Sequence, residues 1–342
     1  MTLHKLFGLM GMGAVALVLA AAACTSDETG TGGSSTGTAT GSNTGGSGTG
    51  TGMGTGGMEE MCVDSAAPTC TSPDPAHENI TQTVTGTVTG TVVDVQGNPV
   101  DQLLTDVCGT NICLFGVTNS AGVMGVESMG NFTAGIGTDQ EFVDVRLLYG
   151  SGKRFAKMAA RLPTIADPTF GTINALNLPD VATGVDMAPN CAIAPNGTQR
   201  SQGGDVTQGD VTLSIPADAA LKHDIVVYEE SQMGFRSTVL DLSGGTYNFP
   251  AVDPALNLEV LVALAPINTT ICPGAKMTFA NTAGWAMGAE VEIFLNGTLT
   301  FNHYAPYGEW EKVAEGVVTA AGVETKGAED IKVLGTYGVR LK

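Results

Sequence analysis

The chain has 342 residues, of which 47 are Gly, and only 14% of its residues are charged. Its 34 acidic residues outnumber the 15 basic ones and give a formal net charge of −19. Such a chain repels nucleic-acid phosphates and anionic lipid head groups, and its turn-rich composition argues against a helical bundle. We therefore expect no nucleic-acid partner.

The N-terminus has the pattern of a secretory signal, which we place at residues 1–23. Lys5 is followed by an uncharged apolar stretch that ends in three alanines, 21–23, directly before Cys24. This pattern resembles a bacterial lipobox, in which the cysteine is diacylated and becomes the new N-terminus after cleavage. An uncleaved transmembrane anchor and ordinary signal cleavage are the alternatives. Acyl chains on Cys24 would hold the mature protein on a membrane without a spanning segment, so we expect a lipid-anchored protein of the bacterial cell envelope, periplasmic or on the cell surface.

The next part of the chain, residues 24–60, is predicted to be the lipidated cysteine and a disordered linker. Residues 25–57 are almost entirely Gly, Thr and Ser, a composition that buries too little apolar surface to become ordered. A Gly-rich coil of this length has a typical reach of ~30–36 Å. Residues 61–82 follow as a short coil, which we expect Cys62 and Cys70 to staple.

From residue 83 the pattern changes to alternation. Val84, Val88 and Val92 share one face and threonines share the other, which predicts a half-buried β-strand. The strand should end in a turn at residues 94–99, where Gly97 supplies a positive φ and Pro99 cannot donate to a strand ladder.

Three short segments resemble a known family. GTVVD at 90–94, GNPV at 97–100 and TNSAGVM at 118–124 are similar to the carboxypeptidase-like regulatory domain, a small prealbumin-like β-sandwich. The resemblance implies this sandwich for residues 83–180. It also implies a structural or binding role, because the family is a non-catalytic module in many secreted proteins.

The second half of the chain is also predicted to be β. Runs of β-branched and apolar residues at 206–215, 223–229, 257–265 and 289–295 are separated by Gly, Pro and Asn at hairpin spacing. Two brief stretches, 154–160 and 217–221, have a helical pattern. The fold class is therefore all-β, with two sandwich-like domains at 83–180 and 190–342.

One hairpin can be predicted in detail. A three-residue loop at 295–297 would pair Ile293 with Leu299 and leave one face uniformly apolar. Gly297 would then be the left-handed residue of the loop.

The cysteines are predicted to form disulfides. Apart from Cys24, the chain contains six: Cys62, Cys70, Cys108, Cys113, Cys191 and Cys272. An even number in an exported protein favours pairing, and proximity favours Cys62 with Cys70 and Cys108 with Cys113, which leaves Cys191 for Cys272. Zinc at Cys108 and Cys113 is the alternative, but no His pair accompanies them. We expect no metal and no cofactor.

No catalytic motif is present, and we predict no catalytic residue. The sequence contains no H-E-x-x-H and no G-x-S-x-G at a strand-to-helix turn. His223 stands at the start of an apolar run, which is typical of a solvated strand end, and His303 lies beside the predicted hairpin, where we expect it to be packed. A secreted hydrolase whose site is assembled from distant residues is kept as an alternative.

Four aromatic residues form the one candidate ligand platform: Trp285, Tyr304, Tyr307 and Trp310. Aromatic rings displayed from loops at one end of a sandwich can stack on sugar rings, but a tryptophan is more often a buried core side chain, so we expect burial in the core and keep the platform as the alternative. The sequence thus predicts a non-enzymatic lipoprotein whose β-domains act as a scaffold, adhesin or binding module for an unidentified protein or carbohydrate partner. A carbohydrate-binding lipoprotein is the first alternative.

Overall fold

The fold is taken from a computed structural model, which describes residues 70, 86–100, 104–108, 113–117, 131–136, 144–148, 155–161, 169–189, 191, 197–223, 234–298 and 304–342. All of them belong to one compact unit, Gly54–Lys342. Apart from the short 3₁₀ helices η1 (Val181–Thr183), η3 (Leu242–Gly244) and η4 (Pro254–Leu256), their regular structure is β-strand. The predicted all-β class is confirmed. Within these residues no helix is long and apolar enough to span a membrane.

The strand predicted after residue 83 is the centre of a three-stranded sheet. The sheet has the order β4 (Asn131–Ile136), β1 (Gly86–Asp94), β7 (Thr169–Ala175). β4 is antiparallel to β1, and β7 is parallel to it. The predicted turn is confirmed: Gly97 has φ +85°, and the Asp94 carboxylate accepts the backbone N–H groups of Gln96 and Asn98 at 2.9 and 2.8 Å.

A four-stranded antiparallel sheet follows. Its order is β3 (Cys113–Val117), β2 (Leu104–Cys108), β5 (Asp144–Leu148), β6 (Ala159–Arg161). The backbones of β2 and β3 lie close to β4 of the three-stranded sheet. The two small sheets are therefore neighbours.

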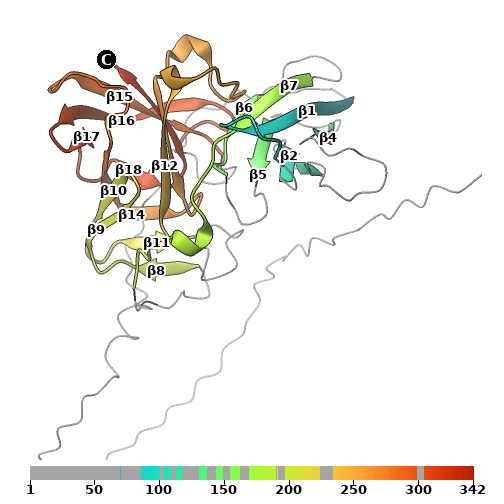
Figure 1. Cartoon of the computed structure of the whole chain (residues 1–342). Helices are drawn as coiled ribbons and strands as arrows, with labels where there is room; N and C mark the ends of the chain where they lie inside the picture. Colours follow the sequence, from blue (N-terminus) through green and yellow to red (C-terminus); the bar gives the residue numbers. More distant parts are fainter. Residues whose placement is uncertain are drawn as a thin grey trace, which may run out of the picture. The chain divides into compact units, whose positions relative to one another are not determined.

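The largest sheet has 12 strands (Figure 1). Its main path has the order β12 (Arg236–Asp241), β13 (Val260–Ala265), β19 (Thr336–Leu341), β15 (Glu290–Asn296), β16 (Trp310–Thr319), β17 (Gly322–Thr325), β14 (Thr270–Phe279), β10 (Val211–Ile215), β9 (Gly204–Gln208). Three further strands lie off this path: β8 (Thr198–Arg200), β11 (Ala220–Lys222) and β18 (Ile331–Val333). Neighbouring strands are antiparallel.

The two ends of this path meet, because the sheet curls. Ser237 of β12 donates its backbone N–H to the side-chain oxygen of Gln208 at 2.8 Å, and its hydroxyl donates to the Gln208 carbonyl at 2.5 Å. Gln208 is the last residue of β9. A side chain therefore links the two edge strands at this point.

The curled sheet encloses the larger of two hydrophobic clusters formed by the described residues, which we call the inner core. It follows the alternation of the strands: Val211, Leu213 and Ile215 of β10 are buried, and so are Val291 and Ile293 of β15. Every second side chain of a strand points to the same face, so one face of the sheet supplies most of this core.

A second cluster, which we call the outer core, lies on the other face of β13. All six residues of β13 are buried; Val260, Val262 and Leu264 belong to the inner core, and Leu261, Ala263 and Ala265 to the outer core. A continuous apolar run such as VLVALA is typical of a strand covered on both faces. The other buried members of the outer core are Ala156, Met158, Ala160, Leu176, Leu178, Phe249, Ala251, Leu258, Ile267 and Phe294.

The outer core joins residues from both sides of the predicted domain boundary. Hydrogen bonds also cross this boundary: the Thr336 hydroxyl of β19 donates to the Lys157 carbonyl at 2.9 Å. The backbone N–H of Asn174 in β7 donates to the Asn248 carbonyl at 2.8 Å. The segments around β6 and β7 are thus packed and hydrogen-bonded to the large sheet.

Two helical predictions are wrong. Residues 155–158 are extended and lead into β6, and Ala220–Lys222 is β11. In the first stretch Ala156, Met158 and Ala160 all enter the outer core, so the apolar spacing has the period of a strand.

The predicted hairpin at 295–297 is also wrong. Ile293 pairs with Ala314 of β16 on one side and with Val339 of β19 on the other, which leaves no edge for Leu299. The chain returns at β16, and Gly297 exchanges backbone hydrogen bonds with the residues that directly precede β16. Gly297 is required by close packing, since a Cβ atom there would lie 1.9 Å from the Pro306 carbonyl oxygen.

Candidate functional site

Several predicted site residues lie outside the described part of the chain. These are the lipidation site Cys24, the cysteine Cys62 and the histidine His303. For Cys108 and Cys113 the structure describes the backbone, in which they are direct partners in the ladder between β2 and β3. Their predicted pairing remains a prediction.

Trp285 is a buried member of the inner core, 8% exposed. Asn281 holds its backbone, accepting the Trp285 N–H at 3.0 Å and donating to the Trp285 carbonyl at 2.8 Å. The indole N–H donates to a Glu259 carboxylate oxygen at 2.9 Å. The ring is thus a core side chain with its polar edge satisfied.

The two tyrosines of the predicted platform are also buried. Tyr304 is 8% exposed and Tyr307 3%. Burial raises the pKa of the Tyr304 phenol above its usual value. Burial also raises the pKa of the Tyr337 phenol, and the neighbouring Tyr304 raises the pKa of Tyr337 further. The phenols of Tyr304 and Tyr337 are therefore neutral at physiological pH.

Tyr304 lines a small cavity of about 10 Å³ between β15 and the turn before β19. Its lining also includes Asn268 and Thr298, whose side chains hydrogen-bond to each other at 2.9 Å. A cavity of this size holds about one water molecule. It is too small for a sugar ring or a substrate.

Trp310 is the first residue of β16 and packs against the outer core, where it is half-buried. Its indole N–H donates to the Ala251 carbonyl. A Cβ atom on Gly338 would lie 3.0 Å from the Trp310 ring, so the ring covers the backbone of β19. The four aromatic residues therefore do not form an exposed platform: three are buried, and Trp285 and Trp310 belong to different cores.

His223 is not a solvated strand end. It is 6% exposed, and both ring nitrogens are hydrogen-bonded, Nδ1 to the Thr269 hydroxyl at 3.1 Å and Nε2 to the Gln199 side-chain oxygen at 2.8 Å. Gln199 donates its amide to the Cys191 carbonyl at 2.8 Å, which directs its oxygen toward the ring. The ring therefore carries its proton on Nε2 and accepts the Thr269 proton at Nδ1.

Burial lowers the pKa of His223 to about 4, and Asp186 opposes this shift only in part. The imidazole is neutral at pH 7. A hydroxyl beside a neutral histidine is the arrangement of a nucleophile and its base. Thr269 is 0% exposed, however, and no substrate can reach its hydroxyl in this conformation. The network of hydrogen bonds connects His223 to the backbone of Cys191 through Gln199.

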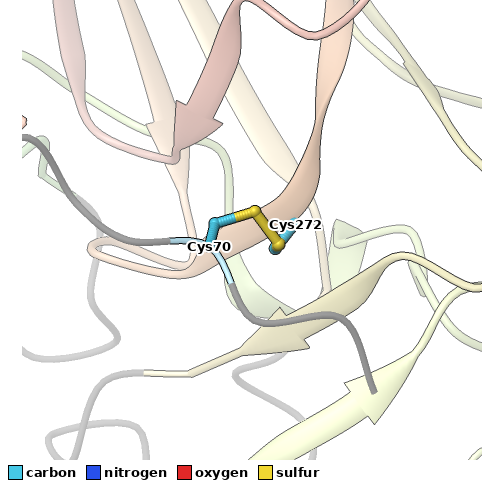
Figure 2. Close-up of a disulfide and its surroundings, with 2 residues drawn as sticks. All are labelled: Cys70 and Cys272. Atoms are coloured by element: carbon cyan, nitrogen blue, oxygen red, sulfur yellow. A yellow bond between two sulfur atoms is a disulfide. The ribbon is translucent and has the colours of Figure 1, made fainter. Parts of the chain in front are cut away.

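The structure contains a disulfide between Cys70 and Cys272, with a Cα–Cα distance of 5.7 Å (Figure 2). Two pairings predicted from proximity are therefore wrong, Cys62 with Cys70 and Cys191 with Cys272. Cys191 is disulfide-bonded as well. Proximity in sequence failed because the folded chain brings Cys70 to the middle of the large sheet across a separation of 202 residues.

Asn296 is a buried polar residue whose structural role the local sequence does not reveal. It is 1% exposed, accepts the Ala159 N–H at 2.8 Å and donates to the Ala159 carbonyl at 3.1 Å. Its amide thus pairs with β6 as another strand would. An Asn followed by Gly predicts a turn, and only the long-range packing reveals the other use of the side chain.

Among the described residues, no group of three or more His, Cys, Asp or Glu side chains is placed to hold a metal ion. A comparison of the whole chain with protein-family models and with curated proteins finds no match.

Proposed function

We propose that the protein is a lipid-anchored bacterial envelope protein. Cys24 carries the anchor, residues 25–57 form a flexible tether, and the β-region acts as a non-enzymatic scaffold, adhesin or binding module. The observation that carries this proposal is the order of segments in the sequence: an apolar signal, three small residues, a cysteine, and then a long Gly, Thr and Ser stretch.

The disulfide supports the exported location. Structural disulfides form and persist in oxidising compartments such as the periplasm and the cell surface. The bond between Cys70 and Cys272 joins the chain just after the tether to an interior strand of the folded region. This arrangement suits a domain that hangs from a membrane anchor.

The arrangement of the first two sheets supports the proposal that residues 83–180 form a carboxypeptidase-regulatory-like module. A sheet of 3 strands and a sheet of 4 strands lie next to each other, as in a small sandwich. The turn from Asp94 to Asn98 lies in the segments that resemble this family. In it Gly97 has a positive φ, and the Asp94 carboxylate accepts the Asn98 backbone N–H. Such a module has a structural or binding role.

The non-enzymatic role rests on what the buried polar groups do. His223 has both nitrogens engaged by Thr269 and Gln199. The cavity beside Tyr304 is the size of a water molecule. These buried features therefore favour a protein that binds a partner through its outer surface over an enzyme with a catalytic cleft.

The anchor is tested by Cys24→Ser in a bacterial host that processes lipoproteins. We expect the variant to leave the membrane fraction for the soluble fraction, or to accumulate as an uncut precursor. Ser34→Ala, a change within the tether, is the matched control and should stay with the membranes. A Cys24→Ser protein that is correctly cut, unlipidated and still membrane-bound would contradict the proposal.

A further inference from the structure

Cys272 lies on an interior strand of the large sheet. In the ladder it is the partner of Ala220 of β11, while the flanking residues Thr270 and Ala275 pair with β18 on the other edge. Ile271 and Ala275 are 0% exposed. The sulfur atom of Cys272 is therefore attached to a strand that is held by hydrogen bonds on both sides.

The disulfide changes the covalent path through the molecule. Figure 2 shows Cys70 joined directly to Cys272, across a sequence separation of 202 residues. Residues 71–271 lie in the closed ring, and they include both small sheets and β8 to β13. A path from Cys70 to the C-terminus through the disulfide contains only β14 to β19.

We propose that this disulfide is a mechanical latch, which passes tension on the N-terminal tether into β14 and leaves residues 71–271 unstretched. The tension itself comes from the membrane anchor, so its biological source rests on the proposed function. The latch itself does not rest on the proposed function, because it depends only on where the tether joins the folded chain.

The physical reason is that force favours unfolding only through the extension that unfolding releases. A segment inside a closed covalent ring releases no end-to-end extension when it unfolds, so the pull does no work on it. Any further disulfide, including the one at Cys191, can shorten the path but cannot lengthen it. The small sheets and the strands up to β13 are thus shielded from a pull on the tether.

The latch is tested by stretching single molecules of the exported chain between handles on the tether and at Lys342. With the latch closed, the path from Cys272 to Lys342 adds 342 − 272 = 70 residues, or ~230–250 Å when fully extended. Reduction of the folded protein should lengthen the fully stretched molecule by the sequence separation of 202 between Cys70 and Cys272, or ~670–730 Å.

Two variants identify the bond responsible. Without reductant, Cys191→Ser should keep the short stretched length of the parent, because its latch is intact, whereas Cys272→Ser should be longer. Equal lengths before and after reduction, or a Cys191→Ser protein that lengthens while Cys272→Ser stays short, would overturn the proposal. Lipidation plays no part in this measurement, so failure of the latch and failure of the membrane anchor are separate results.

Discussion

The two cores share strand β13 but are built from different parts of the chain. The inner core takes its buried residues from within 187–339, mostly from strands that are neighbours in one sheet. The outer core brings residues 156–178 against β13 and Phe294, with hydrogen-bonded partners 137 and 179 residues apart. A core of the second kind closes long loops and costs more chain entropy to form. Strand alternation therefore specifies one face of β13, while distant segments specify the other.

Removing the segment that covers the outer core should unfold the large sheet. A chain shortened to residues 187–342 loses Met158, Leu176 and Leu178 and exposes Leu261 and Phe294. Burying one large apolar side chain contributes about 1.5–3 kcal/mol, and several such losses approach the whole stability of a typical domain. We expect the shortened chain to be unfolded or aggregated by circular dichroism and light scattering.

The shortened chain also lacks Cys70 and the partner of Cys191, so the full chain with both Cys70→Ser and Cys191→Ser is the control. It keeps the cover and loses only these two disulfides. A soluble 187–342 fragment that melts cooperatively within a few degrees of this control would show that the outer core is dispensable.

A matched pair on β13 compares the two cores directly. Leu261 enters the outer core and Leu264 the inner core, and they are 0% and 1% exposed. Leu261→Ala and Leu264→Ala remove the same atoms from opposite faces of one strand, so each should cost about 2–5 kcal/mol in the free energy of unfolding. Denaturant titration measures both. A negligible cost for Leu261→Ala beside a full cost for Leu264→Ala would mean that the outer core is loosely packed.

Only part of the fold and of the candidate site could be predicted from the sequence. The strand that ends at Asp94 and the Gly97 turn were predictable because local pattern and turn chemistry agree there. Burial of Trp285 was the favoured prediction, since a tryptophan is more often a core side chain than part of an exposed platform. Burial of Trp285 is decided by Glu259 and Asn281, which approach it only in the folded chain.

The long-range contacts were not predictable in the same way. Sequence proximity gave the wrong partner for Cys272, because folding brings Cys70 to β14 across a separation of 202 residues. The buried place of His223 depends on Gln199 and Thr269, which come from two other segments. No local pattern marks such a network.

Acid should lower the stability of the folded protein through His223. Burial lowers its pKa to about 4 in the folded protein, while the unfolded chain has the ordinary value near 6.5. The unfolded state therefore takes up a proton first, so the stability is complete above pH ~6.5 and falls as the pH drops toward 4. The loss should total about 2–4 kcal/mol.

The measurement is the pH dependence of the free energy of unfolding between pH 7 and 4, compared with that of His223→Gln. The variant should show a flatter dependence, whatever its stability at pH 7. Lys222→Gln changes the exposed neighbour on β11 and should keep the slope of the parent. An unchanged slope in His223→Gln would assign the acid sensitivity to other groups.

The smallest effect concerns Arg340, which ties the outer core to β19. Its guanidinium donates two hydrogen bonds to Glu292, at 2.9 and 2.7 Å, and a third to the Leu256 carbonyl at 2.7 Å. It also lies over the Phe294 ring, 4.9 Å from the centroid. A lysine keeps the charge but cannot serve the carboxylate, the carbonyl and the ring together, so Arg340→Lys should cost about 1–2 kcal/mol.

Lys326→Gln provides the matched control for this test. Lys326 pairs with Glu290 at 2.6 Å, but both side chains are well exposed, at 39% and 49%, and such ion pairs contribute little to stability. Denaturant titration should therefore find Lys326→Gln indistinguishable from the parent and Arg340→Lys weaker. Equal stabilities for all three proteins would mean that the loop around Leu256 is held by its apolar contacts alone, because the fork of Arg340 would then add nothing to the packing of the outer core.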